Sequence, residues 1–227
     1  MKKIIKLLIL IILSLSVYFI YQQTKNKTIT IMAIGDGLSL GINSYGIEEY
    51  SYLNYYKDYL EEENIILSNN YSKKDLTIKE TIEAIKNKAS IKRDLREADK
   101  LFLNIGYNDL IFYLNLEDNI TQPKYHKIIS NIEKDFENLI KEITKYYKNE
   151  IIVIGYYKSN KDDIYIEKGI LDLNNYLKNN HKITYIDTYH ILENRNKYFS
   201  NPNSNYPNNY GYQRIATKII EKTLEKS

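Results

Sequence analysis

The chain contains no cysteine among its 227 residues. Disulfide bonds, catalysis by a thiol and zinc sites built from thiolates are therefore all excluded. Tryptophan is also absent, whereas tyrosine occurs 24 times, so we interpret the abundance of tyrosine as a feature of the composition rather than as a sign of function. The hydrophobic fraction of 43% and the charged fraction of 27% are those of a globular protein. The length suits one domain with a sizeable core and a short appendage.

Basic and acidic residues balance over most of the chain. The formal net charge is +3, and the three lysines of residues 1–23, a segment without acidic residues, account for it. From Thr24 onward, 29 basic residues stand against 29 acidic ones. Nucleic-acid binding needs a concentrated basic face. We therefore expect no nucleic-acid partner.

One long apolar run extends from Leu7 to Tyr21, directly after the lysines. Its length suits the apolar region of a signal sequence and is slightly short for a membrane span. Neither a small-x-small cleavage site nor a lipoprotein cysteine follows it. We expect residues 1–23 to be an uncleaved signal anchor, and residues 24–227 to form one domain outside the membrane, because the lysines stay cytoplasmic. Cleavage and secretion is the alternative.

From residue 27 onward, short apolar runs alternate with longer amphipathic segments. Runs rich in Ile and Val predict five strands, at Thr28–Ile34, Ile65–Ser68, Lys100–Ile105, Ile151–Gly155 and Ile183–Asp187. Helical periodicity predicts six helices, at Tyr52–Glu62, Thr77–Lys88, Ser90–Ala98 with Ser90 as N-cap, Lys124–Tyr147, Glu167–Asn179 and Tyr212–Glu225. Strands that alternate with helices favour a parallel sheet covered by helices on both faces.

Three loops follow strands, where α/β proteins bind their ligands. Residues 35–41 form a turn punctuated by glycines after the first strand. Residues 106–109 form an irregular stretch after the third strand, and residues 201–211, rich in Asn, Pro and Gly, precede the last helix. We expect these loops to meet at one edge of the sheet.

In their order and spacing these loops resemble the motif blocks of the SGNH (GDSL) hydrolase family. Residues 33–41 match the family's Gly-Asp-Ser-Leu block except at one position, and residues 105–110 match its Gly-x-Asn-Asp block. Residues 203–216 keep the Pro-Asn and Gly-Tyr frame of the last block. The resemblance spans about residues 28–225. It implies a flavodoxin-like three-layer α/β/α fold with a five-stranded parallel sheet, and hydrolysis of esters without a cofactor as the ancestral activity.

The departures from the family fall on its catalytic positions. Its nucleophilic serine aligns with Gly37, its aspartate with Asn203 and its histidine with Tyr206. Asn108 is retained, and in the family this amide helps to stabilise the oxyanion. The remaining block, which supplies a glycine amide, falls within residues 70–77. There Lys74 or Asp75 takes the place of the glycine.

A nucleophilic mechanism needs a hydroxyl, a base to activate it and a group that orients the base. Gly37 has no side chain, and Tyr206, with an ordinary pKa of about 10, is a poor base at neutral pH. We therefore expect a catalytically impaired pseudo-hydrolase. It would bind an acylated lipid, a glycan, a cell-wall ligand or a partner protein, with Asp36, Ser39 and Tyr107 contributing to the binding site.

Other arrangements of the same residues remain open. An active esterase with a rearranged triad of Ser39, His190 and Asp187 is the main alternative, because residues 187–190 read Asp-x-x-His. A nucleotide-binding loop at residues 35–41 would need its third glycine at Leu40.

The two remaining histidines, His126 and His181, stand next to no second ligand type at metal-binding spacing. We interpret both as structural and expect no metal site.

Overall fold

A computed structural model describes residues 6, 11–18, 27–117, 119–158, 160, 163–201 and 203–225. Its strands form one sheet in the order β2-β1-β3-β4-β5, in which every neighbouring pair is parallel. The strands are β1 (Lys27–Gly35), β2 (Asn64–Asn70), β3 (Lys100–Asn104), β4 (Ile151–Ile154) and β5 (Ile183–Ile186). The helices are α2 (Gly37–Leu40), α3 (Tyr52–Glu61), α4 (Ile78–Asn87), α5 (Ala89–Glu97), α6 (Tyr107–Asn115), α7 (Gln122–Ile143), α8 (Ile164–Lys178), α9 (Thr188–Ile191), α10 (Arg195–Tyr198) and α11 (Asn209–Leu224).

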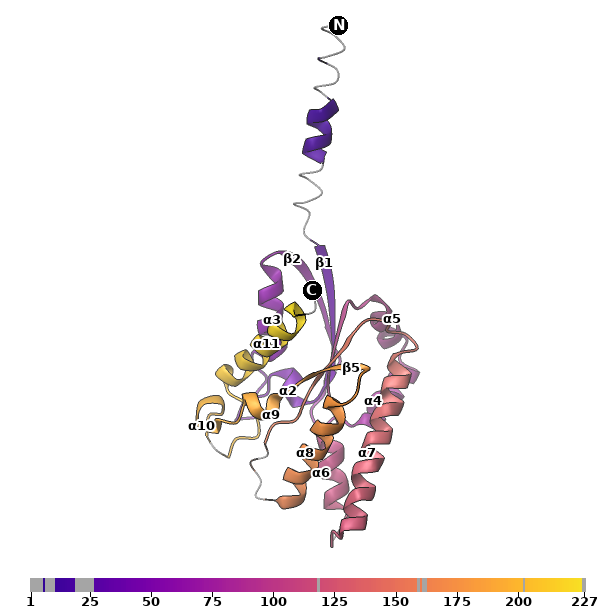
Figure 1. Cartoon of the computed structure of the whole chain (residues 1–227), viewed down its shortest axis with the longest axis vertical. Coiled ribbons are helices and arrows are strands. Elements are labelled where there is room, and N and C mark those ends of the chain that lie inside the picture. Colours follow the sequence, from indigo (N-terminus) through magenta and orange to yellow (C-terminus); the bar gives the residue numbers. More distant parts are fainter. Residues whose placement is uncertain are drawn as a thin grey trace.

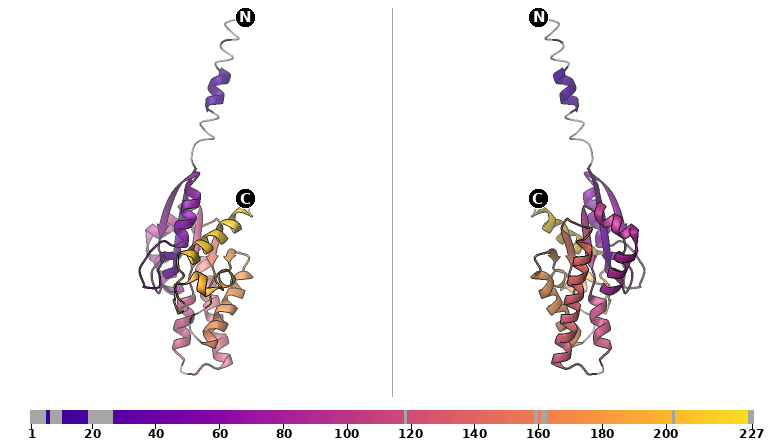
Figure 2. Two further views of the ribbon diagram at one scale, coloured as in Figure 1. Left: turned by 90° about the vertical axis from the view of Figure 1, so that its left-hand side faces the viewer. Right: turned by 90° about the vertical axis from the view of Figure 1, so that its right-hand side faces the viewer.

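The two faces of the sheet bury separate cores because side chains alternate along each strand. Along β1, Met32 and Ile34 point into one core, and Ile31 and Ala33 point into the other. Helices α4, α5, α6, α7 and α8 contribute to the first core, and α3 and α11 contribute to the second. Figures 1 and 2 show these helices as layers on opposite sides of the strands. The three-layer α/β/α fold predicted from the sequence is therefore confirmed.

The predicted strands agree with the observed ones to within two residues at either end, and the six predicted helices to within four. Two local predictions were wrong. Ser90 is not an N-cap, because α5 begins at Ala89 and Lys88 occupies the cap position without a side-chain hydrogen bond. The stretch 106–109 is not irregular, because α6 begins at Tyr107 directly after Gly106. The first turn of α6 consists of polar residues, so the apolar periodicity that indicates a helix is not visible there.

Residues 11–18 are helical and lie beyond the start of β1 (Figure 1). Their apolar side chains are exposed, among them Leu13 at 58% and Val17 at 64%. Most of the other residues of the predicted signal anchor, 1–23, lie outside the described residues. Within the described part of the chain, none of the helices combines the length and the apolar character that crossing a bilayer requires. The signal anchor stays a prediction.

The order of the strands determines where a ligand can bind. After β1 the chain goes outward to β2 and then returns to β3 on the other side of β1, so the connections diverge at the carboxyl ends of β1 and β3. Such a divergence opens a crevice at that edge of the sheet. In Figure 1 the chain enters β1 at the top of the domain and runs downward, so the crevice lies at the end away from residues 11–18.

Candidate active site

The turn after β1 is held by Asp36, the N-cap of α2. Its Oδ1 accepts a hydrogen bond of 3.0 Å from the Leu38 amide, and its own amide donates to the Asn104 carbonyl at 3.0 Å. The side chain is only 9% exposed. Burial, with a smaller contribution from the nearby charge of Asp75, raises the pKa of Asp36 to about 7. Asp36 therefore fixes the first loop to β3 and sets a buried carboxyl group beside the cavity.

The loop after β3 needs a glycine at its corner. Gly106 has φ +112°, and a Cβ there would lie 2.4 Å from the Tyr156 hydroxyl oxygen. Two side chains then tie the start of α6 to the loop before α4. The Asn108 side-chain amide donates to the Leu76 carbonyl at 3.1 Å, and the Asp109 carboxylate accepts the Ile78 amide at 3.1 Å. Burial raises the pKa of Asp109 to about 6.

The loop before α4 contains Asp75, which has φ +60°. This left-handed region favours glycine, and aspartate is one of the few other residues that adopt it. Of the two residues proposed for the glycine position, Asp75 rather than Lys74 adopts a conformation that favours glycine. Both side chains are exposed, and both line the same cavity.

The loop before α11 is held in place by its backbone carbonyls. Arg195 donates to the Ser204 carbonyl at 2.7 Å, and the Tyr157 hydroxyl donates to the Asn205 carbonyl at 2.7 Å. The carbonyl of Asn203 accepts a hydrogen bond of 2.6 Å from the Asn160 side chain. These bonds leave the side chains of Asn203 and Asn205 exposed at the cavity.

Tyr206 covers Gly37, the residue that the sequence comparison aligns with the family's nucleophile. A Cβ placed on Gly37 would lie 2.4 Å from the Tyr206 hydroxyl oxygen and 2.6 Å from its Cζ. The phenol thus occupies the space that a serine side chain at residue 37 would enter. Burial raises the pKa of Tyr206 to about 12, and the charges of Asp36 and Asp75 add to this shift. At neutral pH the phenol keeps its proton and can donate a hydrogen bond, but it cannot act as a base.

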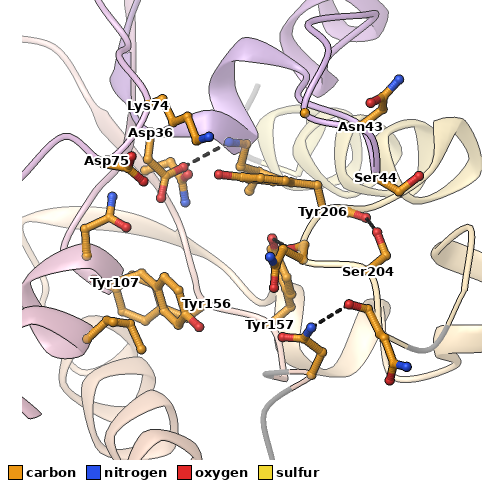
Figure 3. A pocket seen from close by; sticks show the side chains of 18 of the residues that line it. Asp36, Asn43, Ser44, Lys74, Asp75, Tyr107, Tyr156, Tyr157, Ser204 and Tyr206 are labelled. Carbon is orange, nitrogen blue, oxygen red and sulfur yellow. Dashed lines mark hydrogen bonds between the residues drawn. The ribbon is translucent and has the colours of Figure 1, made fainter. Parts of the chain in front are cut away.

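One cavity of about 420 Å³ brings the predicted positions together. Asn108, Asn203 and Tyr206 all line it, with Gly37 directly behind the Tyr206 ring. Asp36 and Tyr107 also line it, and Figure 3 shows their side chains around the cavity with that of Tyr206. Residues from loops that are far apart in the sequence therefore converge at the carboxyl edge of the sheet.

Ser39 does not line this cavity. Its side chain is 1% exposed, and its hydroxyl forms a hydrogen bond of 2.8 Å with the buried Tyr52 hydroxyl. His190 and Asp187 do form a pair, with 2.7 Å between His190 Nδ1 and the carboxylate, but the histidine side chain is 73% exposed. Among the described residues, no hydrogen bond joins Ser39 to His190. The three residues are therefore not assembled into a triad.

His126 and His181 line a different groove, between α7 and α8. Over the described ranges, no cluster of three or more His, Asp or Glu side chains has a geometry that could hold a metal ion.

A family model for GDSL-like lipases and acylhydrolases matches residues 31–219. The chain belongs to this family. Solved structures support the same fold. A lipase from a goat rumen metagenome is 21% identical, with a TM-score of 0.74 over 86% of this chain and 97% of that chain. A catalytic mutant of an acetylxylan esterase from Geobacillus stearothermophilus is 16% identical, with a TM-score of 0.65 over 88% and 95%. A GDSL-family protein from Veillonella parvula is 20% identical, with a TM-score of 0.62 over 85% and 97%. Among curated proteins no match was found.

Sequence reasoning missed a wall of the cavity. Tyr156, Tyr157 and Asn160 follow β4, and Asn43 and Ser44 follow α2. The position of Tyr156 and Tyr157 at the carboxyl end of a predicted strand was a usable signal. It carried little weight in a chain with so many tyrosines.

Proposed function

We propose that this GDSL-family domain is a pseudo-hydrolase at the outer face of a membrane, which binds an acylated or glycan ligand in the former catalytic cleft and does not cleave it. One observation carries the proposal: the phenol of Tyr206 fills the space in which a nucleophile at residue 37 would act. The site lacks the nucleophile, and the residue in the base position is a protonated phenol.

Hydrogen-bond donors that could hold an acyl oxygen are nevertheless present. Asn108 is retained, and the family resemblance gives its amide a role at the oxyanion. The Gly37 amide stands at the start of α2 and has no acceptor among the described residues. Removing one member of a catalytic triad costs several orders of magnitude in rate, whereas binding contacts and oxyanion donors act independently of the nucleophile. The donors therefore favour retained binding.

The ligand class follows from the relatives only as a proposal. The neighbours are described as a lipase and an acetylxylan esterase, so an acyl group on a lipid or on a sugar is the shared chemistry. The apolar run before the domain supports the membrane surface as its proposed location.

The test is esterase turnover by the full-length chain. We expect no hydrolysis of p-nitrophenyl acetate above the rate of a heat-denatured sample of the same protein. If the wild type hydrolyses the ester, and Ser39→Ala or His190→Ala abolishes that activity, the pseudo-hydrolase proposal fails and the rearranged triad replaces it.

A reconstruction tests the motif alignment separately. The triple variant Gly37→Ser, Asn203→Asp, Tyr206→His restores the three residue types that the family uses. We expect measurable esterase activity from it and none from Gly37→Ser alone, which retains the phenol at the nucleophile position. A folded triple variant without activity would count against the alignment.

A further inference from the structure

We propose that the cleft binds an uncharged carbohydrate chain rather than the acyl chain of a lipid. The inference rests on the proposed function, namely that the cleft holds an intact ligand. It concerns the chemical class of that ligand, which the polar groups and aromatic rings of the cavity wall select.

The wall is made mainly of amides and phenols. Of the 20 described residues that line the cavity, seven are asparagines and four are tyrosines, and among these described residues Leu38 and Ile111 are the only aliphatic ones with more than one carbon in the side chain. An amide presents a donor and an acceptor side by side, as do neighbouring hydroxyls on a sugar ring. An acyl chain offers no hydrogen bonds and needs a predominantly apolar wall. The composition of the wall therefore favours a sugar.

Several of these asparagine side chains are held by a hydrogen bond through either the side-chain oxygen or the NH₂ group, and the rest of the amide remains available to a ligand. The Asn43 Oδ1 accepts the Tyr45 amide at 2.8 Å, which leaves its NH₂ group without a partner among the described residues. The NH₂ groups of Asn108 and Asn160 each donate one hydrogen bond to a backbone carbonyl, which leaves a second N–H donor on each, and neither side-chain oxygen has a partner among the described residues. Groups held in this way lose little conformational entropy when a ligand binds.

The side chains of Asn203 and Asn205 make no hydrogen bond within the described part of the chain. Both are exposed and both line the cavity, while their carbonyls hold the loop in position. Their amides are therefore presented to a ligand by a backbone that is already fixed.

Charge and aromatic surface point the same way. Among the described residues lining the cavity, the charged side chains are Asp36, Lys74 and Asp75, a set of mixed sign that gives no reason for a strongly charged ligand. Tyr107 and Tyr206 are half-buried and contribute ring surface to the wall, as Figure 3 shows. A tyrosine ring combines an apolar face with a polar tip, which suits the apolar faces and hydroxyl rims of sugars.

The position of the cleft agrees with this ligand class. The nine residues of β1 separate the start of the domain from the cleft by about 30 Å, at about 3.3 Å per residue. In the anchored orientation that we propose, the cleft faces away from its own bilayer. It is therefore open to polymers beyond the membrane rather than to the lipids beneath the domain.

The experiment measures binding to the full-length chain, kept soluble by an amphipathic polymer instead of detergent. The probes are chitohexaose and xylohexaose as carbohydrates and a monoacyl phosphatidylcholine as the lipid. We expect saturable binding of at least one hexasaccharide and none of the lipid. The double variant Asn203→Ala, Asn205→Ala should weaken that binding about tenfold or more, because each amide contributes at least one hydrogen bond.

Asn115→Ala is the matched control, since Asn115 is an exposed asparagine on α6 that does not line the cavity. It should bind as the wild type does. Binding of the lipid alone, binding of neither hexasaccharide, or hexasaccharide binding unchanged in the double variant would each overturn the proposal. Turnover of p-nitrophenyl acetate together with hexasaccharide binding would refute the pseudo-hydrolase function and leave the ligand class standing. If neither ester turnover nor hexasaccharide binding is observed, the proposed ligand class is refuted and the pseudo-hydrolase function stands.

Discussion

Replacing Gly37 with alanine tests directly whether Tyr206 fills the nucleophile position. The added methyl group would meet the Tyr206 hydroxyl oxygen at 2.4 Å, Cζ at 2.6 Å and Cε1 at 2.8 Å, all well inside van der Waals contact. Overpacking of this kind costs about 1–3 kcal/mol. The atoms met are the far end of a half-buried ring that can turn toward the cavity, so we expect the lower part of this range, about 1–2 kcal/mol.

A double-mutant cycle with Tyr206→Ala isolates the clash from all other effects. In that background the methyl group meets free space, and alanine is favoured over glycine in a helix by up to about 1 kcal/mol. Gly37→Ala should then be neutral or slightly stabilising. The expected coupling energy is therefore about 1–2 kcal/mol.

The assay is urea unfolding of the full-length variants followed by far-UV circular dichroism. For a domain of this size, 1 kcal/mol corresponds to a change of about 2–4 °C in Tm, which gives an independent measurement. Gly46→Ala is the control, because Gly46 has φ +78° and a Cβ there would meet no atom within 4 Å. Its cost should come from backbone strain and should add to that of Tyr206→Ala. If Gly37→Ala costs the same with and without the Tyr206 ring, the phenol does not occupy the nucleophile space.

Three further predictions concern Asp36 and residues outside the cavity. Burial raises the pKa of Asp36 from 3.8 to about 7, so the folded chain keeps a proton that the unfolded chain releases, and the free energy of unfolding falls between about pH 4 and 7. Asp36→Asn, whose side-chain oxygen can still accept the Leu38 amide, should reduce this fall, and at pH 8 it should raise the free energy of unfolding in urea by at most about 4 kcal/mol. Ser39→Ala leaves the buried Tyr52 hydroxyl without its partner and should lower stability by about 1–3 kcal/mol, whereas His190→Ala, at an exposed position, should change it by less than about 0.5 kcal/mol. Equal effects of the two variants would show that burial of the Ser39–Tyr52 hydrogen bond does not contribute to stability. Thr77→Ala removes one half of the capping box with Glu80 at the start of α4 and should lower stability by about 1 kcal/mol, while Thr217→Ala, on the exposed surface of α11, should not.

The elements were predictable from the sequence wherever burial imposes a regular pattern. The short Ile- and Val-rich runs gave the five strands because both faces of a parallel sheet are covered. The start of α6 was not predictable, because Asn108 and Asp109 in its first turn are polar residues that bond the neighbouring loop and form no part of an apolar stripe. The sequence also does not predict in which direction a side chain points from a single helical turn. The Ser39 side chain points to Tyr52, whereas the expectation from the sequence is that it contributes to the cavity.

The packing of the Tyr206 ring against Gly37 could not be predicted from the sequence, for a different reason. The motif alignment placed both residues at catalytic positions, which predicts that they are neighbours. It could not show that the larger side chain fills the space left by the missing one, since that depends on where Arg195 and Tyr157 hold the last loop. Packing between residues far apart in the sequence is decided by the folded backbone.

The family positions that this chain retains differ in kind from those that it has replaced. The Asp36 side chain caps α2 within its own loop, whereas the side chains of Asn108 and Asp109 bond the Leu76 carbonyl and the Ile78 amide and so hold the start of α6 against the segment that begins α4. These bonds are needed for the shape of the cleft whether or not a reaction takes place in it.

The replaced positions make no such bonds. Gly37 has no side chain with which to form one, and Asn203 bonds its neighbours through its backbone amide and carbonyl rather than through its side chain. At Tyr206 the new side chain fills the space that the nucleophile would have used. A chain that still cleaved esters through this site would need the second group. Keeping the groups that shape the cleft while replacing those that react in it is the combination expected of a site that binds its ligand and leaves it intact.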